Sequence, residues 1–144
     1  MGPTETDWRV SRIVDGDTIV VTRDGQQAKV RLIGIDTPES VRPDSPVECF
    51  GPEASAFAKE MLQGRSVELE RDPTQGPIDA YGRQLAYVWY VNEAGQSELF
   101  NLQAIDAGVA REHTYAEPYA WRGAFMAAEE RARSGDRGLW AACR

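Results

Sequence analysis

The sequence predicts an α+β fold, a five-stranded OB-type β-barrel with three α-helices. Two observations predict it: short β-rich runs separated by Asp-Gly breaks, and a single amphipathic helix between the third and fourth strands. The chain has 144 residues, of which 42% are hydrophobic and 27% are charged, so one domain with a substantial core is expected. We expect residues 1–7 to be a disordered or vector-derived N-terminus and residues 8–144 to form the domain.

The first three strands are expected to form an antiparallel meander. Residues 8–14 and 18–22 are β-rich and flank Asp15-Gly16-Asp17, and Asp24-Gly25 precedes a longer strand over residues 26–35. Asp-Gly between such runs is a strong hairpin signal. Residues 40–50 are rich in polar residues and proline, so we expect a loop there.

The later elements follow from their hydrophobic periodicity. We expect helices at residues 51–63, 98–107 and 118–133 and strands at residues 66–70 and 84–91, with loops at residues 72–77 and 92–96. The first helix has proline in its first turn and is stopped by Gly64, and the third shows Trp121, Ala124, Phe125 and Ala128 on one face. Leu139 and Trp140 are expected to dock on the core.

The stretch K-V-R-L-I-G-I-D-T-P-E, residues 29–39, combines a strand with charged groups. Alternation puts Arg31 on the face that carries two isoleucines, which is an unusual place for a guanidinium unless that face opens into a cleft. Asp36 and Glu39 follow at the end of the strand. Five strand steps from Arg31 to Asp36 span roughly 17 Å, so the strand must curl if the two are to meet, and Gly34 would allow it.

Charge and cysteine content limit the function classes. A net charge of −7 argues against broad attraction to polyanions. Two cysteines are too few for a zinc site with sulfur ligands, but Cys49 and Cys143 could form one disulfide, the alternative being two unrelated thiols. With His113 as the single histidine, histidine-metal and Ser-His-Asp chemistry are excluded as the main reaction, and we interpret His113 as a surface or helix-edge residue. No apolar run approaches the length of a membrane span, and the sequence shows no leader pattern, so we expect that any secretion signal has been removed or never existed.

Two segments could carry chemistry. Asp15-Gly16-Asp17-Thr18 can be a plain hairpin turn, or it can deliver Asp17 as an oxygen ligand beside Asp36, a donor set that favours calcium or magnesium over zinc. Likewise, Asp79-Ala80-Tyr81-Gly82-Arg83 can be a turn with a solvated arginine, or it can bring Arg83 to the same site as Arg31. Two guanidinium groups and a divalent ion would suit a phosphodiester.

Four motifs, V-D-G-D-T, R-L-I-G-I-D-T-P-E, F-G-P-E-A-S-A-F and Y-G-R-Q-L-A-Y, resemble in order and spacing those of the staphylococcal nuclease (thermonuclease) family. The resemblance covers residues 10–140 and implies one nuclease domain that hydrolyses DNA and RNA with calcium, leaving 3′-phosphate and 5′-hydroxyl ends. It implies calcium ligands at Asp17, Asp36 and the carbonyl of Thr37, and catalytic roles for Arg31, Arg83 and Glu39. Tyr81 and Tyr115 match substrate-binding tyrosines. Secretion to the exterior or the cell surface, and a monomer, are also expected.

Two other functions stay open. The same barrel can serve as a noncatalytic nucleic-acid- or protein-binding module, and it can be a calcium-stabilised structural domain. The retained acidic residues and arginines count against both. The chain also departs from the family prototype, because Ala80 stands where that nuclease has lysine and the whole chain is acidic where that nuclease is basic.

Overall fold

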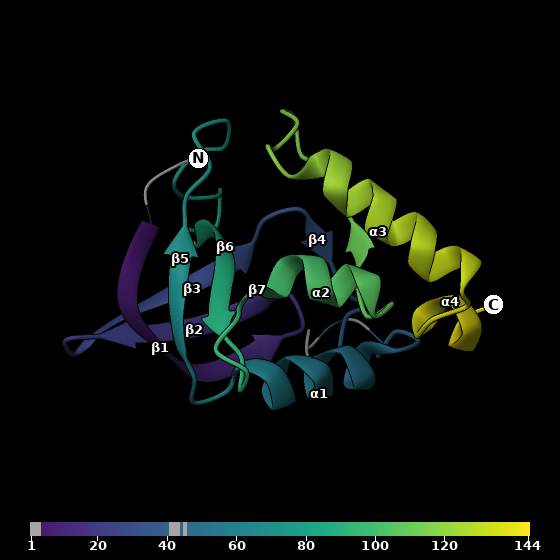
Figure 1. Cartoon of the computed structure of the whole chain (residues 1–144), viewed down its shortest axis with the longest axis horizontal. Coiled ribbons are helices and arrows are strands. Elements are labelled where there is room, and N and C mark those ends of the chain that lie inside the picture. The colour runs from purple at the N-terminus through teal and green to yellow at the C-terminus, as the bar shows by residue number, and fades with distance from the viewer. Residues whose placement is uncertain (1–3, 41–43, 45) are drawn as a thin grey trace.

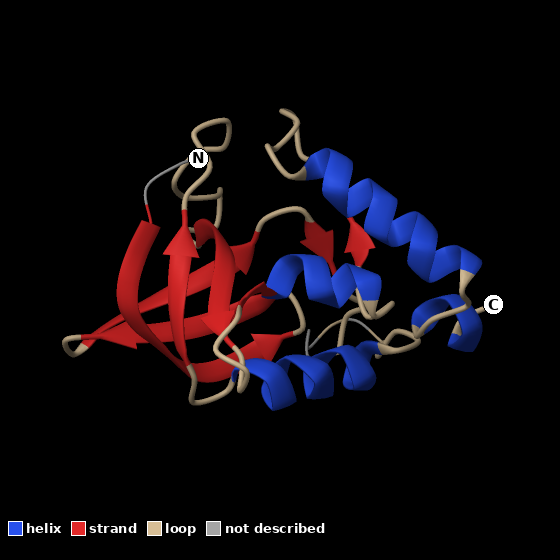
Figure 2. Cartoon of the chain, in the orientation of Figure 1, coloured by secondary structure: helices blue, strands red, loops and turns tan. Residues whose placement is uncertain are grey.

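The computed structural model describes residues 4–40, 44 and 46–144. A β-barrel forms one side of the molecule and the helices gather on the other (Figure 1, Figure 2). In chain order the elements are β1 (Thr4–Asp15), β2 (Thr18–Arg23), β3 (Gln26–Leu32), β4 (Ile35–Asp36), α1 (Gly51–Leu62), β5 (Ser66–Glu70), β6 (Gln84–Val91), β7 (Ser97–Leu99), α2 (Phe100–Asp106), β8 (Arg111–Glu112), α3 (Arg122–Ser134) and α4 (Leu139–Ala142).

Five strands close into the barrel. Their hydrogen-bonded order is β3-β2-β1-β5-β6, and β6 pairs back with β3. This closing pair is parallel, from Val30 opposite Gln84 to Leu32 opposite Ala86, whereas the other four pairs are antiparallel. The prediction of a five-stranded OB-type barrel with three main helices is therefore confirmed. The short strand β7 extends the sheet along β6, and α4 adds one turn of helix near the C-terminus.

The predicted meander is present, and its second turn has the geometry that Asp-Gly favours. Arg23 pairs with Gln26, so Asp24 and Gly25 form a two-residue loop, with φ of 52° and 77°. Positive φ at both positions defines a type I′ turn, whose twist matches that of the flanking strands. The first Asp-Gly segment likewise joins β1 to β2, with Asp15 opposite Thr18.

Gly34 divides the strand that the sequence predicts over residues 26–35. Its φ is +83°, and a Cβ there would lie 2.7 Å from ring atoms of Phe125 and Tyr119. The chain therefore leaves the barrel after Leu32 and forms β4, which pairs with β8. This second small sheet was not predicted, because two-residue strands leave no periodic signal.

Three predicted boundaries are wrong. Residues 4–7 belong to β1 rather than to a disordered N-terminus: Thr4 pairs with Glu70, and the Glu5 carboxylate accepts a 2.8 Å hydrogen bond from Arg71 Nε. The second helix begins at Phe100, because the preceding residues pair with β6 as β7. The third helix begins at Arg122 and leaves Ala124 exposed, while Phe125 and Ala128 are buried as predicted. Residues 1–3 lie outside the described part of the chain.

The C-terminal segment is tied to the body of the protein at two places. Leu139 is fully buried, and its N–H donates to the carbonyl of Gly108 at 2.8 Å. Cys143 forms a disulfide with Cys49, at a Cα–Cα distance of 5.8 Å. Within the described residues, no helix is both long enough and apolar enough to cross a membrane.

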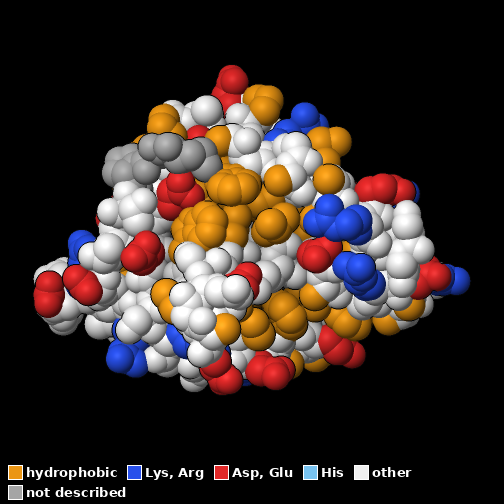
Figure 3. Space-filling model, in the orientation of Figure 1, with side chains coloured by type: hydrophobic (Ala, Val, Ile, Leu, Met, Phe, Trp, Pro, Cys, Tyr) orange, Lys and Arg blue, Asp and Glu red, His pale blue; other side chains and the backbone are white. Residues whose placement is uncertain are grey.

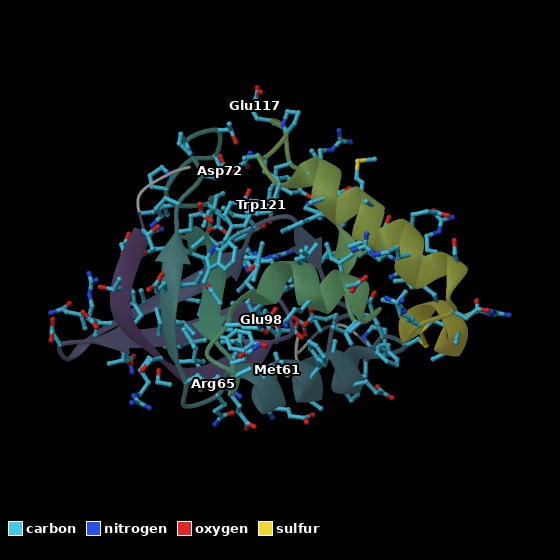
Figure 4. All side chains as sticks on the ribbon, in the orientation of Figure 1. Met61, Arg65, Asp72, Glu98, Glu117 and Trp121 are labelled. Atoms are coloured by element: carbon cyan, nitrogen blue, oxygen red, sulfur yellow. A yellow bond between two sulfur atoms is a disulfide. The ribbon has the colours of Figure 1, made fainter. Side chains whose placement is uncertain are left out.

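Asp72 joins the barrel to the segment before α3 (Figure 4). The carboxylate is 3% exposed and accepts hydrogen bonds from the Tyr87 hydroxyl at 2.6 Å, the Ala120 N–H at 2.8 Å, and the N–H and hydroxyl of Thr74. Burial alone would raise the pKa of Asp72, but these donors together hold it below its usual range. The ionised carboxylate therefore stabilises the fold.

We expect Asp72→Asn to lower the free energy of unfolding by about 2 kcal/mol at neutral pH, because one amide cannot accept all four hydrogen bonds. Since the pKa of Asp72 is depressed on folding, this contribution is present above the unfolded-state pKa and is lost as the pH falls through the lower folded-state pKa. Urea unfolding of both proteins at pH 7 and pH 3 measures the difference. A gap of the same size at both pH values would contradict the assignment.

Candidate catalytic cleft

A polar cleft of about 360 Å³ lies where the β1–β2 turn, β3, β4 and the residues before β6 meet. Six of the eight predicted catalytic, metal and substrate residues line it, namely Asp17, Arg31, Asp36, Glu39, Arg83 and Tyr115. Its other lining residues are Val14, Asp15, Thr18, Lys29 and His113. Four carboxylates and three basic side chains therefore share one hollow.

A second hollow, of about 500 Å³, surrounds Arg71 and is larger. The Arg71 guanidinium is already bonded to the carboxylate of Glu5, the side chain of Gln84 and the carbonyl of Leu85. None of the predicted site residues lines this hollow. Most of the site residues suggested by the sequence therefore lie in the smaller, more polar cleft.

Arg31 contacts two of the cleft carboxylates. Its Nη2 lies 3.4 Å from Asp17 Oδ2 and 3.4 Å from Asp36 Oδ1, so both carboxylates face the same nitrogen. Its Nη1 donates to the carbonyls of Leu32 at 3.0 Å and Ile35 at 2.7 Å. Arg31 is only 7% exposed, and the turn at Gly34 folds the chain back so that it meets Asp36. The guanidinium is thus fixed in direction.

Asp17 links the first turn of the barrel to the segment after β4. Its Oδ2 accepts the Thr37 N–H at 2.9 Å, and its Oδ1 accepts the Thr18 hydroxyl at 3.0 Å. Gly16 permits this approach, because a Cβ there would lie 2.8 Å from Thr37 Cγ2. Thr37 does not line the cleft; its hydroxyl is buried and meets no hydrogen-bond partner among the described residues.

Asp15 is a cleft carboxylate that the sequence interpretation missed. It is buried and accepts hydrogen bonds from the Gly16 N–H at 2.9 Å and from the hydroxyls of Ser40 and Ser55. Burial raises the pKa of Asp15, and the negative charges of Asp17 and Glu39 raise it further. The D-G-D spacing could have suggested it, but the first aspartate was assigned to the turn.

Asp36 is the exposed carboxylate of the pair. Desolvation in the cleft raises the pKa of Asp36 and the charge of Asp17 adds to this, while Arg31 and His113 lower it. Because the side chain remains 60% exposed, solvent screens these effects. For Asp15 and Asp36 alike, burial is the largest cause of the raised pKa and neighbouring carboxylates add to it, so a bound cation would favour the ionised forms.

Arg83 enters the cleft from the segment before β6. Asp79 orients it, since Arg83 Nε donates to Asp79 Oδ2 at 2.7 Å and Asp79 Oδ1 accepts the Arg83 N–H at 2.9 Å. Tyr81 is 84% exposed and does not line the cleft, although its ring lies 5.3 Å from the Arg83 guanidinium. Residues 79–83 therefore form a turn, as one alternative expected, and this turn also places Arg83 in the cleft.

The other side of the cleft is formed by residues after β8. Tyr115 lines it and packs edge-to-face on His113, with ring centroids 4.6 Å apart. His113, which the sequence suggests is a surface or helix-edge residue, also lines the cleft. The His113 N–H donates to the Gly34 carbonyl at 2.9 Å, and this pairing beside β4, which the sequence did not reveal, places it there.

The donor set is compatible with calcium. Asp17, Asp36 and the Thr37 carbonyl are hard oxygen donors from adjacent segments. Among the described residues, no three Asp, Glu, His or Cys side chains gather closely enough to hold an ion by themselves. Backbone oxygen and water would have to complete the shell, which the irregular geometry of calcium tolerates better than that of magnesium.

Comparison with known proteins shows which proteins this chain resembles. The model of the family described as staphylococcal nuclease homologue matches residues 29–142. The thermonuclease of Staphylococcus hyicus is 40% identical over 94% of this chain and 76% of its own length, and that of Staphylococcus intermedius is 41% identical over 92% and 75%. The SPbeta prophage-derived endonuclease YokF of Bacillus subtilis is 36% identical over 93% of this chain and 44% of its own.

Proposed function

The chain belongs to the staphylococcal nuclease family and is a phosphodiester-hydrolysing nuclease, and from this premise we propose that it cleaves DNA and RNA in a calcium-dependent reaction that leaves 3′-phosphate and 5′-hydroxyl ends. The observation that carries the proposal is the Arg31 guanidinium, which faces Asp17 and Asp36 in the cleft that also contains Glu39 and Arg83.

The arginines are suited to bind the scissile phosphate. Arg31 is held by two backbone carbonyls and Arg83 by Asp79, so their donors are oriented before substrate arrives. Each guanidinium would bind nonbridging oxygens and balance the negative charge that develops in the transition state. Glu39 would orient the attacking water in line with the departing 5′ oxygen and would accept a proton from that water. A calcium ion held by Asp17, Asp36 and the Thr37 carbonyl would supply Lewis-acid polarisation of the phosphate.

The test is digestion of supercoiled plasmid and of RNA, with calcium and then with a calcium chelator. We expect cleavage with calcium, none with chelator, and recovery when calcium is restored. The 3′ ends should support polymerase extension only after phosphatase treatment. Retained binding without cleavage would instead support a noncatalytic module, and full cleavage in chelator would contradict the calcium requirement.

Salt should affect this nuclease weakly. On the face shown in Figure 3, Lys and Arg are interspersed with Asp and Glu rather than gathered into one basic surface. With a net charge of −7, we expect few phosphate contacts outside the cleft. Between 50 and 200 mM salt, we therefore expect kcat/KM to fall by no more than about 10-fold. A drop of about 1,000-fold or more, as expected for many phosphate contacts, would contradict this prediction.

The compartment is also a proposal. A disulfide is typical of proteins in oxidising surroundings, so the Cys49–Cys143 link supports secretion or display at the cell surface. Fractionation of the producing cells, with nuclease activity measured in each fraction, would test this. We propose a monomer, which sedimentation would test.

A further inference from the structure

We propose that the Cys49–Cys143 disulfide, acting through Glu48, positions Glu39 in the cleft. The inference rests on the proposed catalytic role of Glu39. It assigns a positioning role to two groups outside the cleft lining, because neither Glu48 nor Cys49 contributes to that lining. The structural link can be followed bond by bond.

Glu39 and Glu48 are joined twice through hydrogen bonds. The Glu39 N–H donates to Glu48 Oε1 at 2.6 Å, and the Glu48 N–H donates to the Glu39 carbonyl at 2.9 Å. Glu48 thus contacts both backbone polar groups of Glu39. These bonds fix the backbone from which the Glu39 side chain extends into the cleft.

The position of Glu48 is in turn set by two residues that follow it in the chain. Gly51 donates its N–H to the Glu48 carbonyl at 2.9 Å as α1 begins. Gly51 also packs so tightly that a Cβ there would lie 2.5 Å from the Glu39 carbonyl oxygen. Cys49, the residue directly after Glu48, is covalently bonded to Cys143.

The far end of the disulfide is anchored to the body of the protein. Besides the buried Leu139, Trp140 of α4 lies under two guanidinium groups, those of Arg111 at 5.2 Å and Arg133 at 5.3 Å. Arg111 belongs to β8 and lies opposite Asp36 of β4. The disulfide therefore connects the Glu39 segment to a helix that contacts β8, the strand paired with β4, and β4 carries the predicted calcium ligand Asp36.

The covalent link matters because Glu48 and Cys49 are exposed to solvent. A hydrogen bond at an exposed site competes with water and contributes little to a fixed geometry. Closing the segment with a disulfide removes open conformations, so the Glu48–Glu39 bonds are kept more of the time. An error of about 1 Å in the position of a catalytic group can lower the rate about 100-fold.

The kinetic test compares Glu48→Ala, Glu48→Gln and the double variant Cys49→Ser/Cys143→Ser in saturating calcium. We expect kcat to fall about 10- to 100-fold in Glu48→Ala and about 10-fold in the cysteine variant, with KM within a factor of about two. Glu48→Gln keeps an acceptor and should restore most of kcat. Because both act through one path, combining Glu48→Ala with the cysteine changes should add little.

Two controls separate positioning from stability. Val67→Ala removes buried atoms from β5, away from the cleft, so a loss of stability alone should leave its kcat unchanged. Amide hydrogen exchange at Glu39 gives a readout that needs no catalysis. We expect the Glu39 amide to be protected in the oxidised protein and to lose protection in the cysteine variant or after phosphine reduction.

Unchanged protection at Glu39 together with wild-type kcat in the cysteine variant would overturn the inference. A fall in kcat of the same size in Val67→Ala would also overturn it, because the effect would then be one of stability. If the wild-type protein did not cleave nucleic acid, the proposed function would fail, but the exchange experiment would still decide whether the disulfide positions Glu39.

Discussion

Arg83→Lys is expected to lower kcat/KM on DNA by about 100- to 1,000-fold at saturating calcium. Lysine keeps the charge and can keep an ion pair with Asp79, but its single ammonium cannot donate two parallel hydrogen bonds to a phosphate. Since the missing contact stabilises developing charge, most of the loss should fall on kcat. Steady-state cleavage of a fluorescent oligonucleotide measures it.

Arg65→Lys is the matched control. The Arg65 guanidinium lies 5.2 Å from the Tyr90 ring, much as Arg83 lies 5.3 Å from Tyr81, but Arg65 does not line the cleft. We expect kcat/KM of Arg65→Lys to stay within about 2-fold of wild type. Near-wild-type turnover in Arg83→Lys would remove Arg83 from the mechanism.

The second large effect is expected for Asp17→Asn, which should raise the calcium concentration for half-maximal activity by about 100-fold. The asparagine oxygen can still accept the Thr37 N–H, so the fold should survive. The variant removes one of the two negative charges that lie 3.4 Å from Arg31 Nη2, and with it one proposed carboxylate ligand. Calcium titration of cleavage, with calorimetric titration of calcium alone, measures the change in both activity and binding.

Asp24→Asn makes the same chemical change in the exposed β2–β3 turn. Asparagine tolerates the positive φ of 52° at that position, so neither stability nor the calcium titration should change. If Asp17→Asn and Asp24→Asn had the same calcium dependence, Asp17 would not be a ligand.

Much of the barrel was predictable because its signals are local. The Asp24-Gly25 turn, the apolar run that became β6 and the face of α1 each depend on residues close in sequence. The start of α3 was not predictable. Residues 118–121 have helical spacing, but contacts with residues distant in the chain hold them outside the helix, such as the hydrogen bond from the Ala120 N–H to Asp72. Likewise, residues 97–99 form a strand because they pair with the edge of β6, which is a tertiary contact.

In the cleft, too, residues within local motifs were predictable and residues placed by distant contacts were not. Asp17, Arg31, Asp36 and Arg83 fall within recognisable motifs, and the curl at Gly34 could be deduced from the reach of an arginine. His113 could not be assigned, because its place depends on the Gly34 carbonyl, which lies far away in sequence. The place of Asp15 in the cleft could not be assigned either, because a hairpin turn already explains an Asp-Gly pair.

The parallel pairing of β3 with β6 also bears on how the enzyme folds. Arg31 lies opposite Leu85, two residues after Arg83, so the register of this one pairing sets the spacing of the two guanidinium groups. Because α1 and β5 lie between the two strands in sequence, their contact is non-local, and such contacts are slow to form. Intermediates that contain the first hairpin but lack this closure should therefore be inactive, and the regain of cleavage during refolding would time the last stage of assembly.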